Sequence, residues 1–356
     1  MILFRFFLFI FMIMLKVKEN YSLINDNTLK IDAKAKYFIE ITTLQELEEF
    51  FQSSLSHEKM VILWGGSNIL FTKDFDGVVL KMLIKGIQEI SNKEEEILVN
   101  VSAGETRQDF VEYCGEHWYA GIENLAWIPW NVWTSPVSNI WAYGMEAKDC
   151  IVSVEWYDLQ THEKKIFTHE QCQFGYRSSI FKKELSSKFL ITSVLFSLHH
   201  LHDYEFNLNY PDIQRYLEEH HLSKSELDIS LVIKMIIDIR DHKLPNPKGT
   251  PNAWSFFANP IIDKNRLSAL LDQYPQLKYF PTDQDDKIKL SAWQLIDLAG
   301  LKGYSNGKAW TSEKHALILV NPHGTSQDVL EVAHHIQEGV YDKFQISLQP
   351  EVVYIQ

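Results

Sequence analysis

The sequence predicts an α/β or α+β protein. From about Ile31 onward, short runs rich in β-branched and aromatic residues alternate with segments whose aliphatic residues recur at helical spacing. The chain has 356 residues, enough for two or three domains with a substantial core. A composition of 46% hydrophobic and 23% charged residues is typical of a folded protein and excludes a disordered or collagen-like chain.

The expected elements follow one another along the chain. Strands are expected at 60–63, 77–82, 97–102, 151–159, 189–198, 315–320 and 344–355. Helices are expected at 106–117, 227–242, 265–273, 291–298 and 327–338, the last of them capped by Ser326. Between these elements, residues 121–146 form a long segment rich in Asn, Pro, Ser and Trp. Long ordered loops of this kind are usually functional.

The first fifteen residues are apolar except for Arg5. This stretch is shorter than the roughly 20 residues that span a membrane, and the charged residues Lys16, Lys18 and Glu19 follow it in place of a cleavage site. Two interpretations stay open, a membrane anchor or an upstream extension with the true start at Met12 or Met14. Residues 1–18 are therefore left out of the predicted fold.

Charge and cysteine content exclude several kinds of partner. The net charge of −13 makes nucleic acid and anionic lipid surfaces unfavourable partners. The three cysteines, Cys114, Cys150 and Cys172, have no metal-ligand spacing and are too few for a disulfide framework. We therefore expect a reducing compartment and no metal site.

Two segments could hold a phosphate-bearing cofactor. Residues 64–68 form a turn of small residues between two apolar strands, where backbone N–H groups can converge on an anion, although an ordinary turn has the same pattern. Residues 128–144 combine turn formers with hydroxyl, amide and large apolar side chains, which fits a loop around a planar cofactor as well as a surface loop. Residues 303–308 lack the spacing of a phosphate-binding loop.

Three isolated polar residues stand in otherwise apolar or turn-rich surroundings. They are Arg177 in FGYRSSIF, Ser255 in NAWSFFANP and Glu351 in LQPEVVYI. A glutamate in an apolar terminal strand is costly to bury unless it is paired, so Glu351 is either exposed or functional. Periodicity does not decide between these alternatives.

A series of motifs carries a resemblance to a known family. In order, they are GGSNILF, SAGE, GIENLAWIPWNVWTSPVSNIWAYG, FGYRSSIFK, KLPNPK, NAWSFFANP, LIDLAGLKG, KHALILVN and LQPEVVYI. Together they resemble the UDP-N-acetylenolpyruvoylglucosamine reductases, also called UDP-N-acetylmuramate dehydrogenases, over residues 19–356. The segment around Tyr210 is similar to the longer subtype, which carries a tyrosine-bearing loop over the substrate.

The resemblance implies an α+β fold with an FAD-binding domain of the vanillyl-alcohol-oxidase type. It implies this domain at 19–200 and a C-terminal α+β substrate-binding domain at 201–356, whose last strand returns to the active site. The implied activity is the NADPH-dependent reduction of UDP-N-acetylglucosamine enolpyruvate to UDP-N-acetylmuramate, with FAD as cofactor. The reaction serves peptidoglycan synthesis, hence cell shape and division, and implies a cytoplasmic location. A flavin oxidase of the same fold acting on another sugar is the rival enzyme.

The resemblance also assigns residues. It implies that Ser255 protonates the substrate and that Arg177 and Glu351 act at its carboxylate, a role that fits stabilisation of developing charge. The implied substrate-binding residues are Tyr176, Tyr210, Lys243 and Asn259. The implied cofactor-binding residues are Trp64, Gly65, Gly66, Ser67, Asn68, Pro129, Thr134, Ser135, Asn139, Ile140, Ala142 and Gly144.

One departure from the family pattern is systematic. Tryptophan stands where the resemblance leads us to expect glycine at Trp64, Trp130, Trp133, Trp141, Trp254, Trp293 and Trp310, with Trp118 and Trp127 as further cases. An indole at a turn around a cofactor phosphate should block FAD. Two hypotheses follow: a catalytically inactive nucleotide-sugar binding protein, or UGA codons that mean glycine and were translated as tryptophan. Replacement by a single residue type favours the second.

Overall fold

The computed structural model describes residues 15–94, 96–128, 130–243, 250–282 and 284–356. Contacts within the chain divide it into two compact units. The described part of the first unit is 15–18, 38–64 and 78–242, and the second unit is 19–37, 65–77 and 243–356. Each unit is therefore made of several separate stretches of the chain. The division into an FAD-binding domain at 19–200 and a substrate-binding domain at 201–356 stays a prediction. The apolar segment 1–14 lies outside the described residues.

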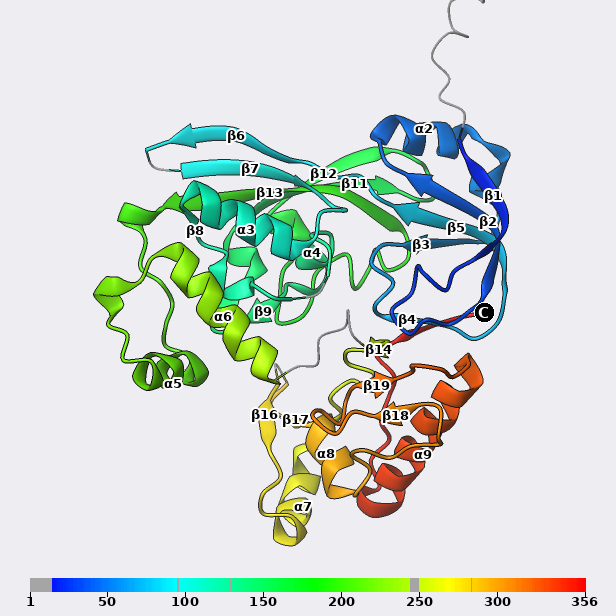
Figure 1. Cartoon of the computed structure of the whole chain (residues 1–356), viewed down its shortest axis with the longest axis vertical. Coiled ribbons are helices and arrows are strands. Elements are labelled where there is room, and N and C mark those ends of the chain that lie inside the picture. The colour runs from blue at the N-terminus through cyan, green and yellow to red at the C-terminus, as the bar shows by residue number, and fades with distance from the viewer. Residues whose placement is uncertain (1–14, 95, 129, 244–249, 283) are drawn as a thin grey trace, which may run out of the picture. The chain divides into compact units, whose positions relative to one another are not determined.

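A six-stranded antiparallel sheet belongs to the first unit, and helices α3 (Arg107–His117) and α6 (Ile229–Lys243) lie on one side of it (Figure 1). The strand order is β12-β11-β13-β7-β6, and β8 pairs with the end of β13. Buried residues alternate with less buried ones along β7, as expected for a sheet that is packed on one face. The strands are β6 (Ile87–Lys93), β7 (Glu96–Ser102), β8 (Tyr119–Ala120), β11 (Ile151–Asp158), β12 (Lys164–Thr168) and β13 (Phe189–His200).

Helix α3 packs on this sheet, α6 packs on α3, and α5 is hydrogen-bonded to α6. The ring of Phe110 in α3 (Arg107–His117) lies 4.8 Å from that of Phe196 in β13. Helix α6 (Ile229–Lys243) packs closely on α3, because a Cβ at Gly115 would lie only 2.9 Å from Ile233 Cδ1. From α5 (Pro211–Glu219), the hydroxyl of Tyr216 donates to Asp238 of α6 at 2.8 Å.

A second, four-stranded sheet has the order β1-β2-β5-β3. Strands β3 and β5 are parallel, with Met60 opposite Val78. Helix α2 (Leu44–Gln52) begins with a capping box between Thr43 and Glu46. The chain passes from one unit to the other within three strands of this sheet. The strands are β1 (Val17–Ser22), β2 (Lys34–Ile41), β3 (Met60–Leu63) and β5 (Phe75–Met82).

The second unit contains three small sheets. Two are antiparallel, with the orders β14-β19-β18 and β15-β17-β16, and in the third β20 lies parallel to β4. The strands are β4 (Ile69–Phe71), β14 (Asn252–Ala253), β15 (Ile261–Asp263), β16 (Tyr279–Pro281), β17 (Lys287–Leu290), β18 (Trp310–Thr311), β19 (Leu319–Val320) and β20 (Val353–Ile355). The helices are α7 (Leu267–Gln273), α8 (Ala292–Leu298) and α9 (Ser326–Phe344).

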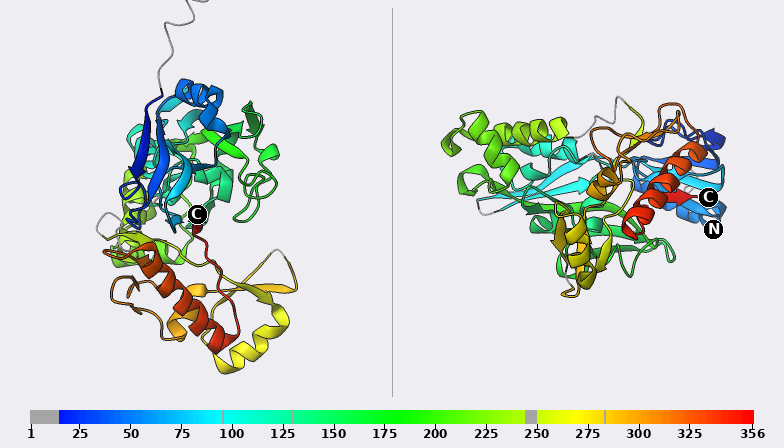
Figure 2. Two further views of the ribbon diagram at one scale, coloured as in Figure 1. Left: turned by 90° about the vertical axis from the view of Figure 1, so that its right-hand side faces the viewer. Right: turned by 90° about the horizontal axis from the view of Figure 1, so that it is seen from below.

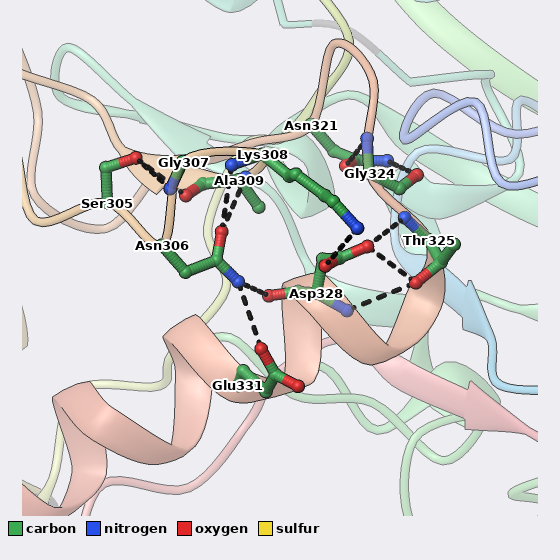
Figure 3. A network of polar contacts seen from close by, with 10 residues as sticks. All are labelled: Ser305, Asn306, Gly307, Lys308, Ala309, Asn321, Gly324, Thr325, Asp328 and Glu331. Carbon is green, nitrogen blue, oxygen red and sulfur yellow. Dashed lines mark hydrogen bonds and ion pairs between the residues drawn. The ribbon is translucent and has the colours of Figure 1, made fainter.

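Helix α9 is the longest helix of the second unit, and its start is fixed by a polar network (Figure 3). Thr325 and Asp328 form a capping box, and Lys308 Nζ lies 3.3 Å from Asp328 Oδ1. The hydrogen bond from the Thr325 side chain is the main reason why the pKa of Asp328 is lowered. Asn306 Nδ2 donates to Asp328 O at 2.9 Å. The turn at 303–308 therefore anchors the start of a helix.

After α9 the chain turns back along the helix toward β20 (Figure 2). Gln345 ends the helix in a left-handed conformation, and Gln337 Nε2 donates to Leu348 O at 2.8 Å. The return brings residues 349–351 against the segment that contains Ser255.

A buried polar segment near residue 27 fixes the turn at Gly66. Asn27 is 3% exposed and its amide donates to Leu23 O and Ile31 O at 2.8 and 2.9 Å. The next residue, Thr28, donates from its N–H to Gly66 O at 3.0 Å. Gly66 has a φ of +65°, and a Cβ there would lie 2.1 Å from the carbonyl oxygen of Asp26. Only glycine fits this turn without rearrangement.

Most predicted elements are confirmed with small shifts. The strand at 60–63 has the predicted bounds, and the predicted helices at 106–117, 227–242 and 291–298 correspond to α3, α6 and α8. The predicted segment 121–146 contains α4 (Thr134–Ser138) and the short strands β9 (Trp141–Ala142) and β10 (Met145–Glu146). Single turns of 3-10 helix lie at Ser54–His57, Glu123–Leu125, Ala147–Asp149, Glu170–Cys172, Leu201–Asp203, Lys224–Glu226 and Lys264–Arg266.

Three expectations are wrong. The strand predicted at 344–355 is reduced to β20, because Phe344 is the last residue of α9 and is buried as part of that helix. The strand predicted at 315–320 is reduced to β19. The N-cap of α9 is Thr325, because its hydroxyl, and not that of Ser326, accepts from the N–H of Asp328.

The turn at Gly66 gives a first test. Gly66→Ala should lower the free energy of unfolding by about 3 kcal/mol or more, because the new methyl group meets backbone and the backbone is left-handed. Gly300→Ala is the matched control, since Gly300 has a φ of +77° and open space around a Cβ; it should cost about 1–2 kcal/mol. Urea denaturation measures both, and equal effects would contradict the steric explanation.

Candidate functional site

The predicted cofactor turn 64–68 is divided between the units. Trp64 directly follows β3 and belongs to the first unit, whereas Gly65, Gly66, Ser67 and Asn68 belong to the second. Asn68 accepts from Val353 N at 3.0 Å through its backbone carbonyl, and its side-chain amide donates to Glu351 O at 3.2 Å. The turn is thus fixed to the segment that carries Glu351.

The second predicted cofactor segment, 128–144, lies in the first unit and is held by α3 and the residues before it. Val132 N donates to Glu105 O at 2.9 Å and Trp133 N donates to Ala103 O at 3.2 Å. Ser135 is 2% exposed, and Ile140 N donates to its carbonyl oxygen. The loop is therefore an ordered part of the first unit.

Arg107 is a buried residue behind this loop that the sequence analysis missed. Its side chain is 1% exposed and donates to Thr134 Oγ1 at 2.5 Å, to Ser135 Oγ and Asn131 O at 3.3 Å, and to Ile128 O at 3.5 Å. Burial lowers its pKa to about 9, with further lowering by the charges of Arg240 and Arg177. An arginine in the first turn of a helix is normally exposed, so no signal in the sequence marked it.

Asn139 links this loop to the turn that carries Arg177. Asn139 is fully buried with a φ of +39°, and its Nδ2 donates to Gly175 O at 2.9 Å and to Glu146. Its Oδ1 accepts from Lys148 N at 3.0 Å. Gly175 and Ser178 pair across the turn, which leaves Tyr176 and Arg177 exposed at its tip. The protein's own groups thus occupy both polar atoms of the Asn139 side chain.

Tyr210 lies in an aromatic cluster of the first unit. Its ring packs edge-on against those of Trp141 and Tyr143, at 5.8 and 5.1 Å. Burial, together with the charge of Asp212, raises the pKa of Tyr210. The phenol is therefore a neutral hydrogen-bond donor at neutral pH.

Arg240 is a second residue that the sequence analysis missed. It projects from α6, where its Nε donates to Trp127 O at 2.9 Å and its guanidinium carbon lies 6.0 Å from the centre of the Tyr143 ring. Burial lowers its pKa. The aliphatic spacing of α6 indicated only a core-facing helix, and it gave no reason to single out one polar residue near the end.

The second unit brings Ser255 and Glu351 together through their backbones. Glu351 N donates to Phe256 O at 2.8 Å, and Ala258 N donates to Gln349 O at 2.9 Å. Phe256 and Phe257 are at most 1% exposed and fix the segment in the core. Ser255 is half-buried and Glu351 is exposed. The side chain of Asn259, three residues after Phe256, accepts from Ala292 N at 2.9 Å through Oδ1.

The predicted residues therefore form two groups. The first unit holds Trp64, Thr134, Ser135, Asn139, Ile140, Ala142, Gly144, Tyr176, Arg177 and Tyr210. The second unit holds Gly65, Gly66, Ser67, Asn68, Ser255, Asn259 and Glu351. Lys243 is the last residue of α6, and Pro129 lies outside the described residues. Within the described residues there is no cluster of His, Cys, Asp and Glu that could hold a metal ion, and no helix is long and apolar enough to cross a membrane.

The cofactor loops fit a dinucleotide in their backbone but not in all their side chains. Gly66 and Asn139 have left-handed backbone conformations, which phosphate-binding turns also use. The rings of Trp64 and Trp133, however, stack on one another at 5.4 Å between centroids and 22° between planes. Two stacked indoles thus lie within these two segments, at Trp64 and Trp133.

Two parts of the chain match known families. Residues 246–355 match the C-terminal domain of UDP-N-acetylenolpyruvoylglucosamine reductase. Residues 35–161 match an FAD-binding domain.

Similar proteins cover nearly the whole chain. UDP-N-acetylenolpyruvoylglucosamine reductase of Flavobacterium johnsoniae is 39% identical over 340 residues, which are 95% of this chain and 99% of that protein. The reductase of Bacteroides fragilis is 38% identical over 95% of this chain and its own full length. The crystal structure of the reductase from Thermus caldophilus has the same fold, with a TM-score of 0.63 at 20% identity over 96% of this chain and 100% of that one.

The role of Arg107 can be tested by a change that keeps its charge. Arg107→Lys should lower the free energy of unfolding by about 3 kcal/mol, because an ammonium group cannot reach the four acceptors of the loop. Arg215→Lys, at an exposed residue of α5, should change it by less than about 0.5 kcal/mol. Urea denaturation compares the two variants. Equal stability of Arg107→Lys and the parent chain would show that the loop does not depend on the guanidinium.

Proposed function

Because the chain belongs to the UDP-N-acetylenolpyruvoylglucosamine reductase family, we propose that Ser255, Arg177 and Glu351 carry out the reaction of this family. The chain is an FAD-dependent oxidoreductase that converts UDP-N-acetylglucosamine enolpyruvate to UDP-N-acetylmuramate in peptidoglycan synthesis, with NADPH as reductant. Its α+β fold contains an FAD-binding domain of the vanillyl-alcohol-oxidase type. The relatives give no support to an inactive nucleotide-sugar binding protein.

One observation supports the assignment of the two residues in the second unit. The hydrogen bond from Glu351 N to Phe256 O fixes Glu351 beside Ser255, although the two are far apart in the sequence. Bound FAD would supply the hydride chemistry between NADPH and the enolpyruvyl group. The protein must then provide a proton for the neighbouring carbon and stabilise the charge that develops on the substrate.

We assign the proton donation to Ser255. A serine hydroxyl is a weak acid in water, so its contribution depends on placement and on partial removal from solvent. The half-buried position of Ser255 and the two buried phenylalanines that follow it meet this requirement. The proton that leaves Ser255 must be replaced from solvent at the end of each cycle.

Arg177 and Glu351 are assigned to the substrate carboxylate. Addition of hydride to an enol ether is easier when the adjacent carboxylate accepts negative charge, and a fixed cation lowers that barrier. Arg177 is exposed at the tip of a turn that Asn139 holds from behind, so its guanidinium is available to an incoming anion. Glu351 is also exposed, which fits a group that meets substrate.

The remaining residues are assigned to binding. Tyr176, Tyr210, Lys243 and Asn259 are assigned to the diphosphate and sugar of the substrate, where tyrosine and asparagine donate hydrogen bonds and lysine acts as a point charge on phosphate. The two cofactor loops are assigned to FAD, with backbone donors at residues 65–68 and hydroxyl groups at Thr134 and Ser135. A cytoplasmic location follows from the nucleotide substrates.

Substitution of Ser255 tests the proton donor. Ser255→Ala should leave reduction of the bound flavin by NADPH unchanged and slow its reoxidation by UDP-N-acetylglucosamine enolpyruvate by about 10²–10⁴-fold, the usual contribution of a general acid. Ser268→Ala, at an exposed residue of α7, is the control and should change neither rate. Stopped-flow absorbance of the flavin separates the two half-reactions. Normal reoxidation by Ser255→Ala would reject the assignment.

Substitution of Arg177 tests the carboxylate contact. Arg177→Met should raise the KM for the enolpyruvyl nucleotide and lower kcat, because a fixed cation is lost both in binding and as charge develops. Arg215→Met provides a control that removes an exposed positive charge of the same unit. Steady-state kinetics at saturating NADPH give both parameters. The assignment fails if the two variants have the same kinetics.

A further inference from the structure

We infer that residues 118, 127, 64 and 133 are glycine positions, and that the protein made in its own cells carries glycine and not tryptophan there. Two of these positions are marked by their backbone conformation. Trp118 and Trp127 have φ values of +61° and +57°, in the left-handed region that bulky residues rarely adopt.

Trp118 ends helix α3 in a left-handed backbone conformation that is typical of glycine. It follows α3 directly with φ and ψ of 61° and 34°, and its N–H donates to Cys114 O and Gly115 O. Helices commonly end with a glycine in this conformation, because it lacks a Cβ. The indole gains little in return, since Trp118 is 53% exposed.

The left-handed conformation of Trp127 is imposed by hydrogen bonds on both sides. Its N–H donates to Gln108 Oε1 at 2.7 Å, and its carbonyl oxygen accepts from Arg240 Nε at 2.9 Å. Both partners belong to helices of the same unit, α3 and α6. These two bonds favour the left-handed backbone at residue 127, and glycine adopts that conformation without the steric cost that tryptophan has.

Trp64 and Trp133 are marked by their contact with each other. Their stacked rings belong to the two segments assigned to FAD, 64–68 and 128–144. This part of the inference rests on the proposed function, because an indole pair is out of place only if these loops hold a cofactor. Glycine at both positions would remove the rings and leave the backbone free to approach phosphate.

The burial of indole nitrogens supports the same conclusion for further positions. Trp130 Nε1 and Trp293 Nε1 are buried and have no acceptor among the described residues, which is costly for a polar group. Trp156 Nε1 also lacks an acceptor, but the Trp156 ring packs edge-on against Phe167 and Phe181, and Lys165 lies over it. Trp156 is thus built into the core of its sheet and serves as the internal control.

Composition points to a single cause. The chain has 15 glycines and 10 tryptophans, whereas an average protein of this length has about 25 glycines. UGA differs from the standard tryptophan codon UGG at one base and is a stop codon in the standard code. Reading UGA as tryptophan where the organism means glycine would convert glycine positions to tryptophan and leave true tryptophans unchanged.

The gene and the native protein test this directly. We expect UGA at codons 64, 118, 127 and 133 and UGG at codon 156, and glycine at the first four positions in peptides sequenced by mass spectrometry of protein from its own cells. UGG at codons 118 and 127, or tryptophan in those native peptides, would overturn the inference.

Thermal unfolding of the protein that carries tryptophan at these positions provides an independent test. Trp118→Gly and Trp127→Gly should each raise the midpoint of thermal unfolding by about 2–4 °C, because each relieves a left-handed backbone strain. Trp156→Gly should lower the midpoint by more than this, because it empties the core. A fall in midpoint for both Trp118→Gly and Trp127→Gly would contradict the assignment of these two positions.

FAD binding separates this inference from the proposed function. Relative to the chain with tryptophan at both positions, the double variant Trp64→Gly/Trp133→Gly should bind FAD at least about tenfold more tightly, as measured by flavin fluorescence. Unchanged or weaker binding by a folded variant overturns the assignment of 64 and 133. If protein from its own cells carries glycine at these positions but binds no FAD, the proposed function fails and the inference stands.

Discussion

The buried guanidinium of Arg107 is the interaction on which the candidate cofactor loop depends. Its side chain donates to four acceptors between Ile128 and Ser135. Asn139 connects this loop to the turn that carries Arg177, because its side-chain amide donates to Gly175 O in that turn. The candidate cofactor loop and the arginine that we propose as catalytic are thus positioned by buried hydrogen bonds, which tolerate little change in length.

The second unit uses backbone pairing for the same purpose. Its chain segments near residues 28, 66, 255 and 351 are connected by main-chain hydrogen bonds, so the positions of Ser255 and Glu351 do not depend on flexible side chains. Gly66 is the most constrained residue among them, because a Cβ would meet a backbone carbonyl. Substitutions that alter only side chains should therefore disturb this arrangement less than substitutions that alter the backbone of its turns.

From the sequence alone, helices and strands could be predicted where the apolar residues are strongly periodic. Candidate site residues could be predicted only where they stand in motifs that resemble the family. Helix α6 was found from its aliphatic spacing, but that spacing concealed Arg240, which faces the aromatic cluster near the end of the helix. Arg107 escaped notice because burial of a helix-start arginine depends on a loop more than twenty residues away. The final strand was predicted too long because the apolar residues at the end of α9 and those of β20 read as one run, whereas the left-handed turn at Gln345 and the segment 346–352 separate them. Tertiary contacts, which a local pattern does not contain, decided each case.

The central claim is that this chain is a flavin reductase of an enolpyruvyl nucleotide sugar. The most direct test is an anaerobic titration of protein purified from its own cells, followed by flavin absorbance. The account predicts that NADPH bleaches the flavin band and that UDP-N-acetylglucosamine enolpyruvate then restores it, with one product molecule formed for each flavin reoxidised. Absence of a flavin band, or a reduced flavin that the enolpyruvyl nucleotide leaves bleached, would contradict it.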